Sequence, residues 1–215
     1  MSDYRIFSDN QLHGKRAEDI LKACFPGASD NERSPFSLWD IEARFDADDR
    51  LPTSIKTSIN NSINFADARN IWSVNEKYRL LIWRYHQVNV TMIQYDVLDE
   101  YIVMRDEHRK LLGNITSQEV EDYHKSIQYD RFSKDETEEC REFAQAYKLE
   151  RNFENRSLIT LCPKIQDTQR RVQGYIGGKV FGSVVKDYRP HHDFYKDIAV
   201  VRLAKRPPRK TRTSN

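Results

Sequence analysis

The chain has 215 residues, with 35 Lys and Arg, 33 Asp and Glu, 38% hydrophobic residues and three cysteines. This composition is typical of a globular protein and excludes a fibrous, disordered or disulfide-stapled chain. A chain of this length can bury a core of normal size without staples. Its longest strongly apolar run, residues 80–83, is far shorter than the roughly 20 residues that span a bilayer. The first residues contain no signal-peptide segment, so we expect a soluble, cytoplasmic protein.

Charge is distributed unevenly along the chain. Residues 157–215 contain 13 Lys and Arg and four acidic residues, a net charge of +9. Because the whole chain has a charge of only +2, residues 1–156 have a charge of −7. A basic C-terminal part indicates a polyanionic partner such as nucleic acid, although a solvated basic tail would produce the same count.

The N-terminal part predicts a helix followed by a hairpin. Residues 14–25 place apolar side chains at helical spacing, and the Pro-Gly pair that follows ends the helix. Residues 37–45 alternate between two unlike faces, as in a strand, and residues 46–50 are rich in turn formers. The β-branched segment 53–59 returns as the second strand of the hairpin.

The middle of the chain predicts two more strands and then helices. Residues 78–85 and 88–104 are rich in aromatic and β-branched residues, and we expect this pair to complete the central sheet. The segment 116–119, Thr-Ser-Gln-Glu, is typical of a helix N-terminus. Residues 133–152 have the pattern of a long amphipathic helix. These helices are expected to cover the sheet.

The C-terminal part returns to strand character. Residues 158–185 predict strands with glycines at turns or bulges, residues 189–194 are expected to be irregular, and residues 198–203 predict a final strand. The basic residues 205–215 are expected to form a disordered tail.

We therefore expect an α/β fold with a mixed central sheet flanked by helices and a β-rich C-terminal extension. A single domain, 1–204, would consist of three parts: a catalytic core (1–104), a helical cover (105–156) and a DNA-recognition portion (157–204).

One pair of residues in the predicted hairpin suggests chemistry. Asp40 lies in the first strand and Lys56 in the second, and an irregular turn can place them opposite each other. Hydrolysis of a phosphodiester needs a divalent cation held by oxygen ligands, together with a cationic group near the attacking water. Asp40, with the main-chain carbonyl of Ile55, can bind the metal, and Lys56 can orient the water. A cross-strand ion pair at the surface is the alternative interpretation.

These residues resemble the PD-(D/E)XK nuclease superfamily, and within it the type II restriction endonucleases. The family has a helix carrying a glutamate, then Asp on one strand and (Glu/Asp)-x-Lys on the next. Here the helix contains Glu18, the first strand contains Asp40, and the second contains Ser54-Ile55-Lys56. The resemblance covers roughly residues 12–104 and implies catalytic roles for Glu18, Asp40, Ser54 and Lys56, with magnesium as cofactor.

The sequence departs from this pattern at Ser54, where the family has an acidic residue. A serine can hydrogen-bond a metal-bound water but contributes no charge, whereas magnesium usually requires one or two carboxylates. Glu18 or Glu42 would supply the missing carboxylate. Glu42 is two residues after Asp40 and therefore points to the same face of the predicted strand.

A rival metal motif is His191-His192-Asp193, although adjacent histidines in a polar segment are more often solvated. The segment 174–178 contains Tyr-Ile-Gly, half of the GIY-YIG nuclease signature, but the Gly-Ile-Tyr partner is missing.

The basic C-terminal part is expected to hold DNA. Arg and Gln side chains read guanine and adenine edges, and a β-ribbon fits the major groove. The residues expected to contact DNA are Asn60, Asn61, Lys164, Gln169, Arg170, Arg171 and Gln173. A hairpin tip in water remains the alternative for Arg170 and Arg171.

The resemblance thus implies a magnesium-dependent restriction endonuclease that cleaves double-stranded DNA. A homodimer is expected, because a palindromic cut matches two-fold protein symmetry. A repair or junction-resolving nuclease and a noncatalytic DNA-binding protein of the same fold are the alternatives.

Overall fold

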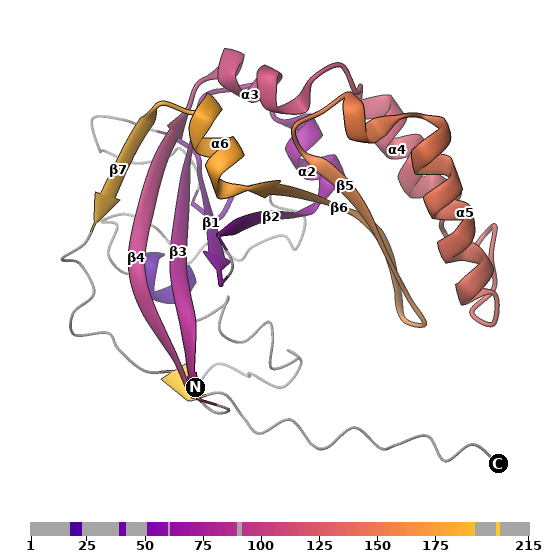
Figure 1. The fold of residues 1–215 in the computed structure, drawn as a ribbon, viewed down its shortest axis with the longest axis horizontal. Helices are drawn as coiled ribbons and strands as arrows, with labels where there is room; N and C mark the ends of the chain where they lie inside the picture. The colour runs from indigo at the N-terminus through magenta and orange to yellow at the C-terminus, as the bar shows by residue number, and fades with distance from the viewer. Residues whose placement is uncertain are drawn as a thin grey trace.

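The structure is a computed structural model, drawn as a ribbon in Figure 1. It describes residues 18–22, 39–41, 51–59, 61–89, 92–191 and 201–202. Several predictions lie outside these residues: those for Glu42, Asn60 and the tail 205–215, and most of the strands expected at 37–45 and 198–203.

The described residues form a five-stranded mixed sheet in the order β1-β3-β4-β7, with β8 also paired to β4. β1 runs parallel to β3, and the other pairs are antiparallel. This sheet confirms the predicted α/β class and the predicted strand pair at 78–85 and 88–104. Its strands are β1 (Thr53–Ser58), β3 (Tyr78–Asn89), β4 (Met92–Val103), β7 (Asp187–His191) and β8 (Val201–Arg202).

A second sheet, absent from the sequence prediction as a separate layer, contains β2 (Ser62–Asp67), β6 (Gln169–Gly177) and β5 (Thr160–Gln166) in that order among the described residues. β2 was not predicted as a strand, because its apolar alternation is limited to Ile63 and Phe65. The strand is also interrupted at Ala66, which has a φ of 59° where the register with β6 shifts.

The helices of the described chain are α2 (Ala68–Ser73), α3 (Arg105–Leu112), α4 (Ser117–Ser126), α5 (Thr137–Glu150) and α6 (Gly178–Val184), with a 3₁₀ turn at Phe153–Asn155. In Figure 1, α4 and α5 lie beside β5 and β6, away from the central sheet that they were expected to cover. Arg141 of α5 donates to the carbonyl oxygen of Ile165 in β5, and Tyr123 of α4 donates to that of Ala144 in α5.

Two C-terminal predictions were wrong. Residues 178–184 form α6 instead of a strand, because Phe181 fills the core against Phe65 and Tyr101. This tertiary contact outweighs the β-branched composition of the segment. Residues 189–194 were expected to be irregular. Their first part, up to His191, instead belongs to β7, which pairs with β4. Among the described strands, β7 pairs with β4 alone, and a strand at an edge can accommodate Pro190 without losing a ladder hydrogen bond.

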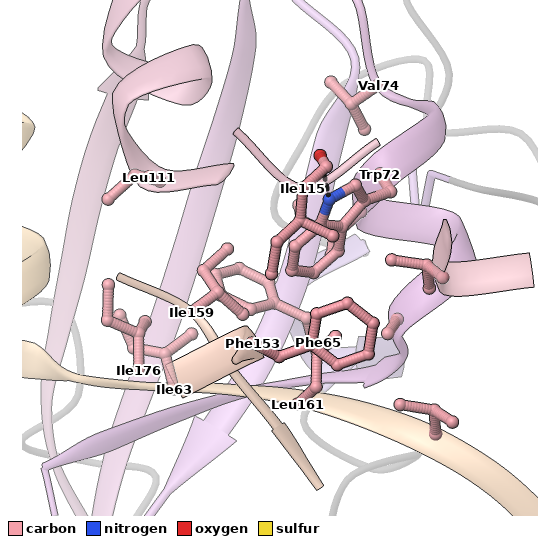
Figure 2. Packing of buried hydrophobic residues seen from close by; sticks show 14 of the residues in the cluster. Ile63, Phe65, Trp72, Val74, Leu111, Ile115, Phe153, Ile159, Leu161 and Ile176 are labelled. Atoms are coloured by element: carbon pink, nitrogen blue, oxygen red, sulfur yellow. Dashed lines mark hydrogen bonds between the residues drawn. The ribbon is translucent and has the colours of Figure 1, made fainter. Parts of the chain in front are cut away.

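One hydrophobic cluster joins the second sheet to a face of the central sheet (Figure 2). Ile63 and Phe65 of β2 and Leu161 of β5 pack in the same cluster as Leu80 of β3. The buried Trp72 of α2 fixes the neighbouring connection, because its indole N–H donates to the carbonyl oxygen of Ile115 at 3.0 Å.

The opposite face of the central sheet has its own smaller cluster. Residues 18–22 are helical, in agreement with the predicted helix, and Leu21 packs there with Ile55 of β1 and Leu81 and Trp83 of β3.

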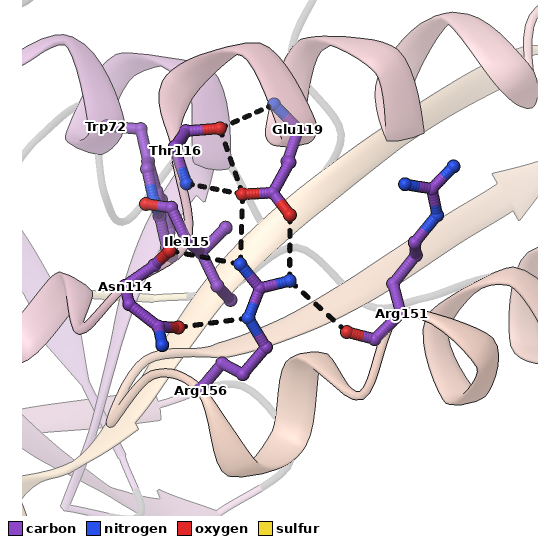
Figure 3. A network of polar contacts seen from close by, with 7 residues as sticks. All are labelled: Trp72, Asn114, Ile115, Thr116, Glu119, Arg151 and Arg156. Carbon is purple, nitrogen blue, oxygen red and sulfur yellow. Dashed lines mark hydrogen bonds and ion pairs between the residues drawn. The ribbon is translucent and has the colours of Figure 1, made fainter.

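The predicted helix start at Thr116 is confirmed and belongs to a larger polar network (Figure 3). The Thr116 hydroxyl accepts a hydrogen bond from the Glu119 N–H at 3.2 Å, and the Glu119 carboxylate accepts one from the Thr116 N–H at 2.8 Å. The same carboxylate lies 2.7 Å from the guanidinium of Arg156, which lowers the pKa of Glu119 to about 2. Arg156 also donates to Asn114, so the network ties the α3–α4 connection to the segment after α5.

We expect Thr116→Ala to lower the free energy of unfolding by about 1 kcal/mol, because it removes the acceptor for the Glu119 N–H. Urea unfolding followed by circular dichroism measures this change. Thr116→Ser is the matched control and should stay close to the unsubstituted protein, since it keeps the hydroxyl. Equal stability of all three proteins would contradict the prediction.

Candidate functional site

The candidate site begins where residues 39–41 meet the start of β1. The main-chain N–H groups of Asp40 and Ile41 donate to the carbonyl oxygen of Thr53 at 2.8 and 3.0 Å. The Thr53 N–H donates in return to the carbonyl oxygen of Ile41 at 2.9 Å. Ile41 and Thr53 therefore form an antiparallel bridge, which agrees with the described part of the predicted hairpin.

The Asp40 carboxylate is the centre of the site. Its Oδ2 atom accepts hydrogen bonds from the main-chain N–H of Ile55 at 2.5 Å and from the Ser54 hydroxyl at 3.3 Å. The Lys56 Nζ lies 3.6 Å from the same oxygen. The Asp40 and Lys56 side chains are 15% and 24% exposed, so the ion pair is largely shielded from water. The structure thus brings together three of the predicted site residues, Asp40, Ser54 and Lys56.

The main chain of Ile55 faces the same edge of the sheet as Asp40. In a strand, the N–H and C=O of one residue point to the same side, and adjacent residues point to opposite sides. The Ile55 N–H reaches Asp40, whereas the Pro52 carbonyl oxygen accepts from Arg79 of β3 on the other side. The Ile55 carbonyl is therefore directed toward the edge where Asp40 lies, as its predicted role requires.

Glu18 is placed differently. The helical residues 18–22 pack through Leu21 on the Ile55 face of β1, whereas the side chains of Ser54 and Lys56 point to the other face. Within the described part of the chain, Glu18 is not among the residues that line the pocket around Asp40.

A pocket of about 180 Å³ adjoins the Asp40–Lys56 contact. One part of its wall is polar and the other is apolar and aromatic. The polar residues are Asp40, Ser54, Lys56 and Asn70, and the apolar ones are Trp39, Phe65, Ala66, Ile71, Val74, Tyr78 and Leu80. Sequence reasoning missed this pocket, because β2 and α2, which form one of its walls, were not predicted. The one available signal was Trp39, directly beside Asp40.

A buried histidine supports the pocket from behind. Tyr78 is 1% exposed, and its hydroxyl lies 3.3 Å from His108 Nδ1. His108 Nε2 lies 3.0 Å from the carbonyl oxygen of Ile71. Burial raises the pKa of Tyr78 well above its usual range and lowers the pKa of His108. A neutral imidazole therefore accepts from Tyr78 and donates to Ile71, which fixes both side chains in the pocket wall.

Asn61 has a structural role, and its expected DNA contact stays a prediction. It adopts a positive φ of 53° in the turn between β1 and β2. Its carbonyl oxygen accepts from the Gly178 N–H at 2.7 Å, and its side-chain oxygen accepts from Arg84 of β3. These contacts join the turn to α6 and to the central sheet.

The β5–β6 hairpin lies within residues 158–185, which were predicted to form strands, and its polar residues fall into two sets. Lys164 pairs with Arg171 and Gln166 with Gln169, so these four side chains share one face. Arg170 points to the other face and is only 5% exposed.

Two residues of the hairpin do not fit the expected base contacts. The guanidinium of Arg170 donates to the carbonyl oxygens of Phe132 and Ser133, both at 2.6 Å. Gln173 is 4% exposed, and its amide lies 2.9 Å from the Tyr175 hydroxyl. Both side chains therefore hold the protein together, and neither is presented to a DNA groove.

The donor set for a metal is incomplete within the described residues. No group of three or more His, Cys, Asp or Glu side chains that could hold a metal occurs there. At the candidate site, Asp40 is the one described carboxylate that lines the pocket. Oxygen ligands from Asp40, Ser54 and Ile55 suit magnesium, which usually takes one or two carboxylates together with waters. Of the rival His-His-Asp motif, the described part is His191, whose Nε2 lies 2.7 Å from a Glu100 oxygen.

Comparison of the chain with protein-family models, with curated proteins and with solved structures gave no significant match. No helix in the described part of the chain is long and apolar enough to cross a membrane.

We expect His108→Gln to weaken the pH dependence of stability. Because the pKa of His108 is lowered in the folded protein, the unfolded chain binds the proton first as the pH falls below about 6.5. The free energy of unfolding therefore decreases with falling pH, by up to about 1.4 kcal/mol for each unit by which the two pKa values differ. His108→Gln removes this contribution.

Urea unfolding at about pH 7.5 and about pH 5.5 measures the effect, since a free histidine titrates between them. The same loss of stability in the unsubstituted protein and in His108→Gln would contradict a neutral His108.

Proposed function

We propose that this protein is a magnesium-dependent endonuclease of double-stranded DNA, with the PD-(D/E)XK arrangement of the restriction endonucleases. The observation that supports the proposal is the contact of Asp40 with Ser54, Ile55 and Lys56 at one edge of β1. A carboxylate, a neutral oxygen and an ammonium group within one site are among the groups that metal-dependent hydrolysis of a phosphodiester uses.

The residues of the site have separate roles in this proposal. Asp40 and the Ile55 carbonyl would hold magnesium, with Glu42 as the second carboxylate, since the helix that carries Glu18 packs on the other face of β1. Magnesium would neutralise the scissile phosphate and acidify the attacking water. Lys56 would orient that water and stabilise the charge that develops on the phosphate. Ser54 would hydrogen-bond a water of the site, and it also helps to hold Asp40 in place.

DNA would be held by the β5–β6 hairpin. Lys164, Gln169 and Arg171 lie on one face of it, opposite the face on which Arg170 binds the α4–α5 connection. The basic tail 205–215 would add phosphate contacts that do not depend on sequence. A homodimer would place two sites on opposite strands of a palindrome.

We expect Lys56→Met and Asp40→Asn to reduce cleavage of supercoiled plasmid in magnesium by about 10²–10³-fold, while binding of DNA is retained. Both substitutions keep the size of the side chain. Lys125→Met is the matched control, because Lys125 forms a similar but exposed pair with Glu121 at 3.5 Å. It should cut like the unsubstituted protein.

The outcomes of this assay separate the candidate functions. Discrete plasmid fragments support a restriction endonuclease, and cleavage of branched DNA alone supports a junction-resolving enzyme. Binding without any cleavage would favour a noncatalytic DNA-binding protein. Full activity of both site variants would overturn the assignment of Asp40 and Lys56.

A second prediction concerns the hairpin. Arg171→Ala and Lys164→Ala should each flatten the dependence of DNA affinity on salt, by about 0.9 in the logarithmic slope per lost phosphate contact. Fluorescence anisotropy over a series of salt concentrations measures the slope. Lys110→Ala on the exposed side of α3 is the control and should leave the slope unchanged. An unchanged slope in both hairpin variants would exclude this face as the DNA-binding surface.

A further inference from the structure

The pocket beside Asp40 has the size and the wall of a site for one aromatic ring system. Its volume of about 180 Å³ is below the range of about 300–1,000 Å³ that is usual for drug-sized ligands. The rings of Trp39 and Tyr78 in its wall have centroids 5.2 Å apart and are inclined by 36°. Phe65 contributes a third ring. Trp39 is half-buried and is the ring that a flat ligand can contact, whereas the buried Tyr78 and Phe65 support it from behind.

The wall is held in place by contacts that the candidate catalytic chemistry does not use. Tyr78 is fixed by His108, and His108 in turn contacts the main chain of Ile71, another residue of the wall. Trp39 precedes Asp40, whose main chain is bonded to Thr53. Binding would therefore require little ordering of these side chains, which favours affinity.

The polar part of the pocket suits a ring that carries a phosphate. Lys56 provides a positive charge at the boundary between the polar and apolar parts, with 24% of its side chain exposed. Asn70 of α2 also lines the pocket and is exposed at the surface. An amide can donate to and accept from the edge of a nucleobase. An aromatic base and its adjoining phosphate match these two parts.

We infer that this pocket receives a single unpaired nucleobase of a DNA strand, whose adjoining phosphate lies at Lys56. The inference rests on the proposed nuclease function, because the same lysine serves both. A base within a duplex is stacked and cannot enter such a pocket. DNA with an unstacked nucleotide, as in a bulge or a flipped base, is therefore the preferred substrate. Since every base has a π-face, the pocket selects for an unstacked base more than for its identity.

The test is a binding experiment in calcium, in which DNA is bound without relying on cleavage. It uses two duplexes of the same sequence, one with a single bulged adenosine and one with an abasic sugar–phosphate in its place. We expect the bulged base to be bound at least about tenfold more tightly. Asn70→Trp should abolish the difference, because the larger side chain obstructs the pocket. Ser73→Trp, on the same helix but outside the pocket, should retain it.

Trp39→Ala gives an independent test from the opposite wall and should also reduce the difference, with folding checked by thermal unfolding. Equal affinity for the two duplexes, or a difference that persists in Asn70→Trp and Trp39→Ala, overturns the inference. If plasmid is cut in magnesium without any preference for the bulge, the inference fails and the nuclease proposal stands. If the bulge is preferred but no DNA is cut, the nuclease proposal fails and the pocket remains a nucleobase site.

Discussion

The candidate site depends on the hydrogen bond from the Ile55 N–H to the Asp40 carboxylate. This bond places Asp40 against the edge of β1 that lies opposite its partner strand β3. The carboxylate also gives the main-chain N–H of Ile55 a hydrogen-bond acceptor. Side chains alternate along β1, so Ser54 and Lys56 point to the face where Asp40 binds them. The side chain of Ile55 points to the other face and packs in the smaller hydrophobic cluster.

The two faces of the central sheet therefore pack against different parts of the protein. Leu21 and Ile55 close one face, where the packing is apolar. The other face supports the second sheet through β2 and α2, and these two elements complete the pocket. The pocket is thus formed at the junction of the two sheets. Its charged and hydroxyl groups come from β1 and from Asp40, and most of its apolar wall comes from segments that follow later in the chain.

Charge and burial together determine which basic residues can meet a polyanion. The net charge of +9 in residues 157–215 includes Arg170, whose guanidinium binds two main-chain carbonyl groups inside the protein. Its neighbour Arg171 points to the other face of the same strand. Because side chains alternate along β6, Arg170 points into the protein and has a structural role. Arg171 points to the other face, where the proposed DNA contact would be made.

The sequence by itself determined the local features. Periodicity predicted the class of fold and the strand pair β3–β4, and the spacing of Thr116 and Glu119 predicted the start of α4. The predicted hairpin indicated that Asp40 and Lys56 would meet, because one short connection joins their two strands. Tertiary structure decided what depends on distant partners. It made a helix of residues 178–184 because Phe181 fills the core, and it buried Arg170 and Gln173. It also formed the pocket from β1, β2, α2 and β3, which no local pattern can reveal, because its wall exists only when separate segments pack together.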